Sequence, residues 1–159
     1  MKIASISRLI VSILVCQLAG VVGSAFTRPA ISSWYATLRK PTFTPPNWLF
    51  GPVWISLFLL MGISAYLIWS KGLQNRKVII ALSIFGIQLV LNMLWSFLFF
   101  KLQSPVYAFI EILILWFAIL FTIIYFFKIS RAASFLLFPY IFWVSFAVIL
   151  NSYIWKLNP

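Results

Sequence analysis

Residues 78–100 read VIIALSIFGIQLVLNMLWSFLFF, a run of 23 residues without a charged side chain between Lys77 and Lys101. A helix needs about 20 residues to cross the hydrocarbon core of a bilayer, which is roughly 30 Å thick. Four other runs have the same texture: 9–27, 48–70, 102–127, interrupted only by Glu111, and 132–155. Hydrocarbon cannot hydrogen-bond exposed peptide groups, so these runs must form helices, and they lack the alternation of barrel strands.

The composition supports this assignment, since 64% of the 159 residues are hydrophobic and only 8% are charged. A soluble domain carries about 25% charged residues. The sequence therefore predicts an all-α, multi-pass integral membrane protein, in the cell membrane if the source is prokaryotic. It forms one domain, residues 1–159, with five transmembrane helices at approximately 5–27, 48–70, 78–101, 105–128 and 132–156.

The net charge of +11 comes from twelve Lys and Arg against one acid. In a soluble protein this balance would suggest nucleic acid. Here the basic residues flank apolar runs, where Lys and Arg reach lipid headgroups, so we expect membrane lipid and no nucleic acid as a partner. Five spans place seven basic residues on the side of the N-terminus and five on the other, which favours a cytoplasmic N-terminus.

The first run has two interpretations. Lys2 and Arg8 before an apolar core, with small residues near its end, are compatible with a cleaved signal peptide. However, Ala19 and Gly23, and Gly20 and Ser24, are spaced as small-xxx-small pairs, which let membrane helices approach closely. We interpret the run as a retained first helix.

The connection 28–47 is unusually long and contains three prolines within six residues, at 41, 45 and 46. Proline fixes φ and removes an amide donor, so the segment is stiff. Its aromatic side chains could form an interfacial belt. The alternative, which we favour because a belt needs no rigid scaffold, is a lid over the mouth of the bundle.

Two polar and aromatic stripes follow helical spacing. The stripe on the third helix consists of Gln88, Asn92, Trp95 and Phe99. The stripe on the fifth helix, which Pro139 should kink, consists of Trp143, Ala147 and Asn151. Carboxamides in hydrocarbon usually point into the bundle. They can link helices, or they can fix a planar polar ligand beside a stacking ring. An aromatic box is possible from Trp34, Tyr35, Trp54, Trp95 and Trp143.

The chemistry available to the chain is narrow, since it has no His, no Asp, one Glu and one Cys. No metal cluster and no intrachain disulfide can form, and hydrolytic acid–base catalysis lacks its usual residues. Glu111 should face inward or be protonated. It has either a structural partner or a role in proton coupling or ligand contact.

Four motifs resemble the tryptophan-rich sensory protein and translocator protein family, whose mitochondrial members are also called peripheral-type benzodiazepine receptors. They follow the family's order along essentially the whole chain: Trp34-Tyr35-x2-Leu38-x-Lys40-Pro41-x-Phe43-x-Pro45-Pro46; Gly51-Pro52-Val53-Trp54; Gln88-Leu89-x2-Asn92-x2-Trp95-Ser96-x2-Phe99-Phe100; and Pro139-Tyr140-x2-Trp143-x2-Phe146-Ala147-x2-Leu150-Asn151. Phe43 stands where the family commonly has Trp.

The resemblance implies a five-helix bundle with a pocket under the first loop that binds porphyrins and, in some members, sterols or drug-like ligands. By position, the ligand-binding residues would be Trp34, Tyr35, Pro45, Trp54, Asn92, Trp95, Trp143 and Ala147. Members often dimerise through small residues on the third helix. A homodimer is thus implied, although Gly86 has no small partner four residues away.

We therefore expect a membrane protein that binds porphyrins, or other apolar planar ligands such as sterols, for sensing, sequestration or transport. No cofactor is obligatory, because porphyrin would be a ligand and no histidine exists to coordinate a haem iron. The alternative is an enzyme that degrades bound tetrapyrrole by light- or redox-dependent chemistry, with Trp54 and Trp143 as electron donors. A channel or scaffold subunit without a ligand is the third hypothesis.

Overall fold

The computed structural model describes the backbone of residues 2–159 and the side chains from residue 5 onward. The described chain is all-helical, and five helical segments are long and apolar enough to cross a membrane. They are Ser5–Ile31, Asn47–Trp69, Arg76–Lys101, Pro105–Phe127 and Arg131–Leu157. The prediction of a five-helix, multi-pass membrane protein is confirmed.

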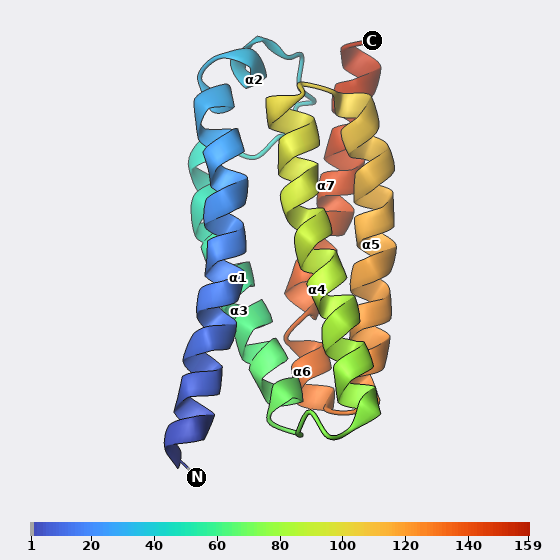
Figure 1. Cartoon of the computed structure of the whole chain (residues 1–159). Helices are drawn as coiled ribbons and strands as arrows, with labels where there is room; N and C mark the ends of the chain where they lie inside the picture. The colour runs from blue at the N-terminus through green and yellow to red at the C-terminus, as the bar shows by residue number, and fades with distance from the viewer. Residues whose placement is uncertain (1) are drawn as a thin grey trace.

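Seven α-helices and one π-helix make up these segments and one connection. In chain order they are α1 (Lys2–Ile31), α2 (Trp34–Thr37), α3 (Asn47–Trp69), α4 (Arg76–Ser96), η1 (Phe97–Lys101), α5 (Pro105–Phe127), α6 (Arg131–Phe135) and α7 (Phe138–Leu157). The two termini lie at opposite ends of the bundle (Figure 1).

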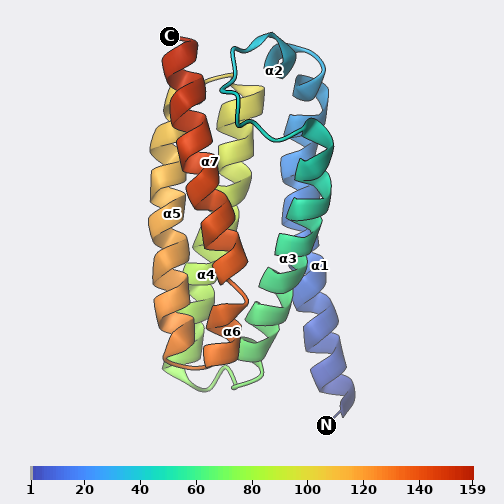
Figure 2. The ribbon, with the colours of Figure 1, turned by 180° about the vertical axis from the view of Figure 1, so that it is seen from behind.

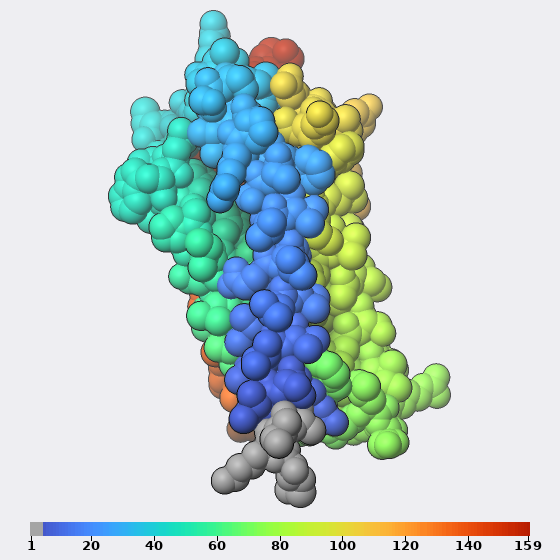
Figure 3. Space-filling view, turned by 60° about the vertical axis from the view of Figure 1, so that its left-hand side comes forward, coloured from blue at the N-terminus to red at the C-terminus, as the bar shows by residue number. Residues whose placement is uncertain are grey.

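The bundle has two parts that meet along α4. One part is the α4, α5 and α7 group, and the other is α1 packed along α3, with α1 also touching α4. Near the N-terminal end α3 packs against α6, but toward the other end α3 and α7 diverge (Figure 2). Side chains of α1 form the outer surface between α3 and α4 (Figure 3). The divergence leaves room inside the bundle at the end away from the N-terminus.

Glycines set the spacing of α1 against its neighbours. A Cβ added at Gly62 of α3 would lie 2.6 Å from the Cα of Ile13, and one at Gly20 of α1 would lie 2.7 Å from the ring of Phe58. Gly23 faces the side chain of Ser96 on α4. The small residues of the first span therefore do what their spacing predicted, since they let α1 lie against both α3 and α4.

The first helix is longer than the sequence suggested. It continues through Pro29 to Ile31, beyond the expected end at residue 27, because a proline removes only its own amide bond. The helix ends where the amide of Ser33 donates to Ala30 O at 3.3 Å and the Ser33 hydroxyl donates to Pro29 O at 2.7 Å. The connection also contains the short helix α2, so the expected loop 28–47 is extended only between α2 and α3.

The fifth span, predicted as one helix over 132–156 with a kink at Pro139, is divided by a short turn into α6 and α7. Pro139 cannot donate to the Phe135 carbonyl, and it lies in the first turn of α7, where no intrahelical donor is needed. Two buried hydroxyls hold α6 in place. Ser64 donates to Ala133 O at 2.7 Å and Ser134 donates to Ile123 O at 3.1 Å.

The third span ends in the π-helix η1, which widens the last turn before α5. The amide of Leu102 donates to Phe97 O at 2.9 Å, and Ser104 then caps α5. This geometry brings Phe99 and Phe100 together against the ring of Tyr35, at centroid distances of 6.2 and 5.8 Å. The end of the third span is thereby joined to the first connection.

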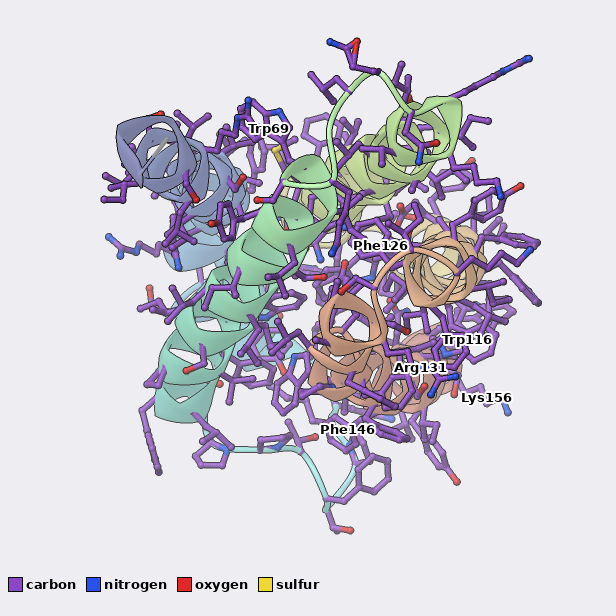
Figure 4. All side chains as sticks on the ribbon, turned by 90° about the horizontal axis from the view of Figure 1, so that it is seen from below. Trp69, Trp116, Phe126, Arg131, Phe146 and Lys156 are labelled. Atoms are coloured by element: carbon purple, nitrogen blue, oxygen red, sulfur yellow. The ribbon has the colours of Figure 1, made fainter. Side chains whose placement is uncertain are left out.

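Basic side chains at the helix ends lie over aromatic rings. Arg8 lies 5.9 Å from the ring centre of Trp69, which is placed between the ends of α1 and α3 in Figure 4. Lys128 and Arg131 lie over Tyr125 and Phe127 at 5.4 and 5.5 Å. These residues mark the interface where amphipathic side chains meet headgroups.

The close approach of α1 and α3 predicts a strong effect of a single methyl group. Replacing Gly62 by Ala places a Cβ against the Ile13 backbone, and we expect it to lower the free energy of unfolding by about 1–3 kcal/mol, the usual cost of overpacking. Gly86→Ala is the matched control, because nothing lies within 4 Å of its Cβ position. Reversible unfolding in mixed micelles, followed by far-UV circular dichroism, measures both. Equal midpoints for the two variants would contradict the proposed packing.

Candidate functional site: an aromatic cavity inside the bundle

The main cavity lies where α3 and α7 diverge, at the same end of the bundle as the first connection. Its volume is about 650 Å³, within the range of roughly 300–1,000 Å³ found for small-molecule pockets. Its lining comes from α1, α2, α3, α4, η1 and α7. Six of the predicted site residues line it: Tyr35, Trp54, Asn92, Trp95, Trp143 and Ala147.

Two predicted site residues do not line the cavity. The ring of Trp34 packs edge-on against Phe99 at 5.5 Å and belongs to a separate apolar cluster that contains Tyr35. Pro45 lies in the extended part of the connection, outside the lining. Neither residue therefore lines this cavity, and their roles in ligand binding stay predictions.

Aromatic rings form the wall between α3 and α7. Phe50 meets Trp143 at 5.9 Å, and Trp54 meets Tyr140 at 6.3 Å, both edge-to-face. On the α4 side, Trp95 stacks on Phe99 at 5.2 Å and 22°. These contacts hold the indoles in place beside the empty volume, so their faces and edges are available to a planar ligand without reorganisation.

The carboxamides of α4 and α7 link helices at membrane depth. Asn92 Nδ2 donates to the Tyr140 hydroxyl at 3.0 Å, and that hydroxyl donates to Gln88 Oε1 at 2.8 Å. Trp95 Nε1 donates to Asn151 Oδ1 at 3.1 Å, and Asn151 Nδ2 donates to Pro105 O at 2.8 Å. The two interpretations of the stripe are therefore compatible, because Asn92 and Trp95 both link helices and line the cavity.

The sequence reasoning missed the contribution of α1. Its small and polar residues form one wall of the cavity: Gln17, Gly20, Gly23, Ser24 and Thr27. Gln17 Nε2 also donates to the Ile55 carbonyl of α3 at 3.0 Å. The signal was present in the spacing of Gly20 and Ser24, but it was interpreted only as helix packing. Small side chains also leave volume unfilled. In α1 they allow close helix packing and also leave space for the cavity.

Arg28, at the end of α1, was also missed as a site residue. It is the one charged side chain in the cavity lining of the described chain. Its guanidinium is exposed, and the neighbouring polar lining residues, Thr27 and Asn47, are uncharged. The lining is thus mainly apolar, with a few uncharged polar residues and one cation.

Comparison with known proteins agrees with this architecture. The TspO/MBR family model matches residues 12–156. The tryptophan-rich protein TspO of Archaeoglobus fulgidus is 46% identical over 97% of this chain and 99% of its own length. The human translocator protein is 36% identical over 86% of this chain and 82% of its own, and protein CrtK of Rhodobacter capsulatus is 33% identical over 91% and 88%.

The family model reaches into all five spans and includes every residue that lines the cavity. The curated relatives align with most of the chain and come from archaea, bacteria and mammals. The chain belongs to the TspO/MBR family of multi-pass integral membrane proteins.

Proposed function

We propose that this protein binds planar, mainly apolar ligands of the porphyrin type in its aromatic cavity, and that it binds them without coordinating a metal. The observation that carries the proposal is the cavity itself, about 650 Å³ in volume, walled by Trp54, Trp95 and Trp143 and open to one cation. Among the relatives, the names tryptophan-rich sensory protein and translocator protein are compatible with sensing or moving such a ligand.

Recognition by stacking follows from the side chains present. The sequence has no histidine, and its one cysteine, Cys16, is buried in the core outside the cavity lining. A porphyrin would instead contact indole faces, the Asn92 carboxamide and the Tyr35 hydroxyl. Burial raises the pKa of that hydroxyl, so it keeps its proton and can donate. Metal-free protoporphyrin is therefore expected to bind about as tightly as haem.

The Ala147 position tests the cavity directly. A leucine there fills part of the volume, and we expect at least a tenfold loss of protoporphyrin affinity, equivalent to about 1.4 kcal/mol of lost contact. Ala132→Leu is the matched control, because Ala132 is exposed at the opposite end of the bundle. Quenching of tryptophan fluorescence measures both affinities. Equal affinities for the two variants would place the ligand elsewhere.

Arg28 tests which part of the ligand lies at the rim. An exposed ion pair contributes up to about 1 kcal/mol, so Arg28→Gln should weaken binding of protoporphyrin, a dicarboxylate, by up to about fivefold. The dimethyl ester of protoporphyrin, and a sterol, carry no carboxylate and should bind both forms alike. Arg39→Gln, at the same end but outside the lining, is the control. A loss of equal size for acid and ester would contradict a carboxylate contact.

The connection between α2 and α3 is proposed to act as a lid over the cavity. Its Phe43 ring meets Phe146 at 6.3 Å and Tyr153 at 5.3 Å, and Phe146 lies beside the connection in Figure 4. The side chain of Asn158 clamps the backbone of Arg39: it accepts from Arg39 N at 3.0 Å and donates to Arg39 O at 2.9 Å. The end of α7 thus tethers the segment that covers the cavity.

Removing this clamp should change the rates of binding more than the affinity. In Asn158→Ala, two hydrogen bonds that hold the closed connection are lost, and we expect ligand association and dissociation to accelerate together by several-fold. Asn75→Ala, which removes a helix cap at the other end, controls for general destabilisation. Stopped-flow quenching with protoporphyrin measures both rates. Unchanged rates in Asn158→Ala would show that the connection does not gate the cavity.

A further inference from the structure

Glu111 is the only acid in the chain, and it lies in the bundle interior. It is on the second turn of α5, and 5% of its surface is exposed. Neither Oε1 nor Oε2 has a hydrogen-bond partner among the described residues, although each is buried. The carboxyl is not part of the cavity lining. A buried polar group of this kind calls for a specific explanation.

No cation is available to pair with the carboxyl. The elements packed against α5 are α4, α6, α7 and η1, and their basic residues are all exposed at helix ends: Arg76, Lys77, Lys101, Arg131 and Lys156. No ion pair to Glu111 occurs in the part of the chain with described side chains. An ionised carboxylate in hydrocarbon without a partner is strongly disfavoured, so the neutral acid is the stable form.

A polar network centred on Tyr140 lies in the same bundle interior as Glu111. A charge on Glu111 would act electrostatically on the Tyr140 hydroxyl. The hydroxyl already donates its proton to Gln88 Oε1 and accepts from Asn92, so one lone pair is left. It can take a further donor but cannot donate to a carboxylate. This also favours the acid form of Glu111.

Gln88 supplies the complementary unpaired group. Its Nε2 is buried with no partner among the described residues, while its Oε1 is held by Tyr140. Three buried polar atoms thus lack partners among the described residues: a donor on Gln88 and the two oxygens of Glu111. Polar groups separated by more than direct hydrogen-bond distance are commonly joined by an internal water, which needs two to four polar partners.

We propose that Glu111 forms a proton-binding site inside the bilayer, in which the neutral acid and the Gln88 amide meet the Tyr140 hydroxyl through an internal water. The water accepts from the Glu111 O–H and from Gln88 Nε2, and it donates to the free lone pair of Tyr140 and to the Glu111 carbonyl. All three unpaired atoms are then satisfied. Because Tyr140 also holds Asn92, this proton site lies directly behind the cavity wall.

The unique acid makes the site measurable in the unaltered, ligand-free protein. Glutamate labelled with ¹³C at the side-chain carboxyl, incorporated by cell-free synthesis into protein in lipid nanodiscs, labels Glu111 alone. At neutral pH we expect the infrared C=O stretch of a protonated carboxylic acid, shifted by the label and absent in Glu111→Gln. If the labelled protein showed carboxylate stretches and no acid C=O stretch, the proposal would be overturned. This outcome does not depend on whether the variant folds.

Two further measurements test the connection to Tyr140 and the water. Tyr140→Phe should shift the acid C=O stretch, whereas Asn151→Leu, in the separate Trp95 network, should not. In the wild-type protein, solid-state NMR should show polarisation transfer from water protons to the labelled carboxyl. An unshifted band in Tyr140→Phe, or no transfer from water, would refute the water-linked site. None of these measurements uses a ligand, so their outcome is independent of the proposed function.

Discussion

Hydrocarbon offers no hydrogen-bond partner, and the placement of almost every polar group in this protein follows from that constraint. The backbone meets it by forming helices along each apolar run. Serine and threonine hydroxyls meet it by donating to carbonyls of their own helix, as Ser56 does to Pro52 O and Thr122 to Ala118 O. The larger polar side chains cannot do so, and they pair across helices. The networks around Tyr140 and Asn151 are therefore the points at which α4, α5 and α7 are fixed in register.

The cavity lies where this hydrogen bonding between helices ends, at the boundary between the α4, α5 and α7 group and the α1 and α3 pair. The group of α4, α5 and α7 is held by buried hydrogen bonds and by continuous apolar packing. By contrast, α1 and α3 touch each other through glycines, and α3 reaches α7 mainly through aromatic rings near Trp54 and Phe50. Rings in edge-to-face contact connect α3 with α7 without filling the space between the two helices. The same aromatic residues thus hold the two parts of the bundle together and leave a lined space between them.

Much of this could be predicted from the sequence, and the reasons for the failures are specific. The five spans were predictable because apolar length and helical hydrogen bonding are local properties. The inward stripes of α4 and α7 were predictable because helical spacing puts their residues on one face. The break between α6 and α7 was underestimated as a kink, because the hydroxyl contacts of Ser64 and Ser134 that stabilise it come from distant segments.

The cavity lining, too, could be predicted from the sequence only in part. Trp34 and Pro45 were expected at the ligand because they belong to a motif, but their packing is decided by Phe99 and by the course of the connection. Arg28 and the α1 wall were missed because a small residue gives no sign of whether it faces a helix or a void. The ligand-binding roles of all eight predicted residues stay predictions.

The same constraint bears on what the cavity can recognise. Trp95 Nε1 and Asn151 are committed to protein partners, so the polar groups that the described lining offers a ligand include Asn92 Oδ1, Asn47, the Tyr35 hydroxyl and the Arg28 guanidinium. Two of these, Tyr35 and Arg28, come from α2 and from the end of α1. An apolar ring system would thus be selected by shape and burial deep in the bundle, and its polar groups by the rim. Ligands that are apolar at one end and anionic at the other satisfy both, which is the pattern of a porphyrin with its acidic edge toward the membrane surface.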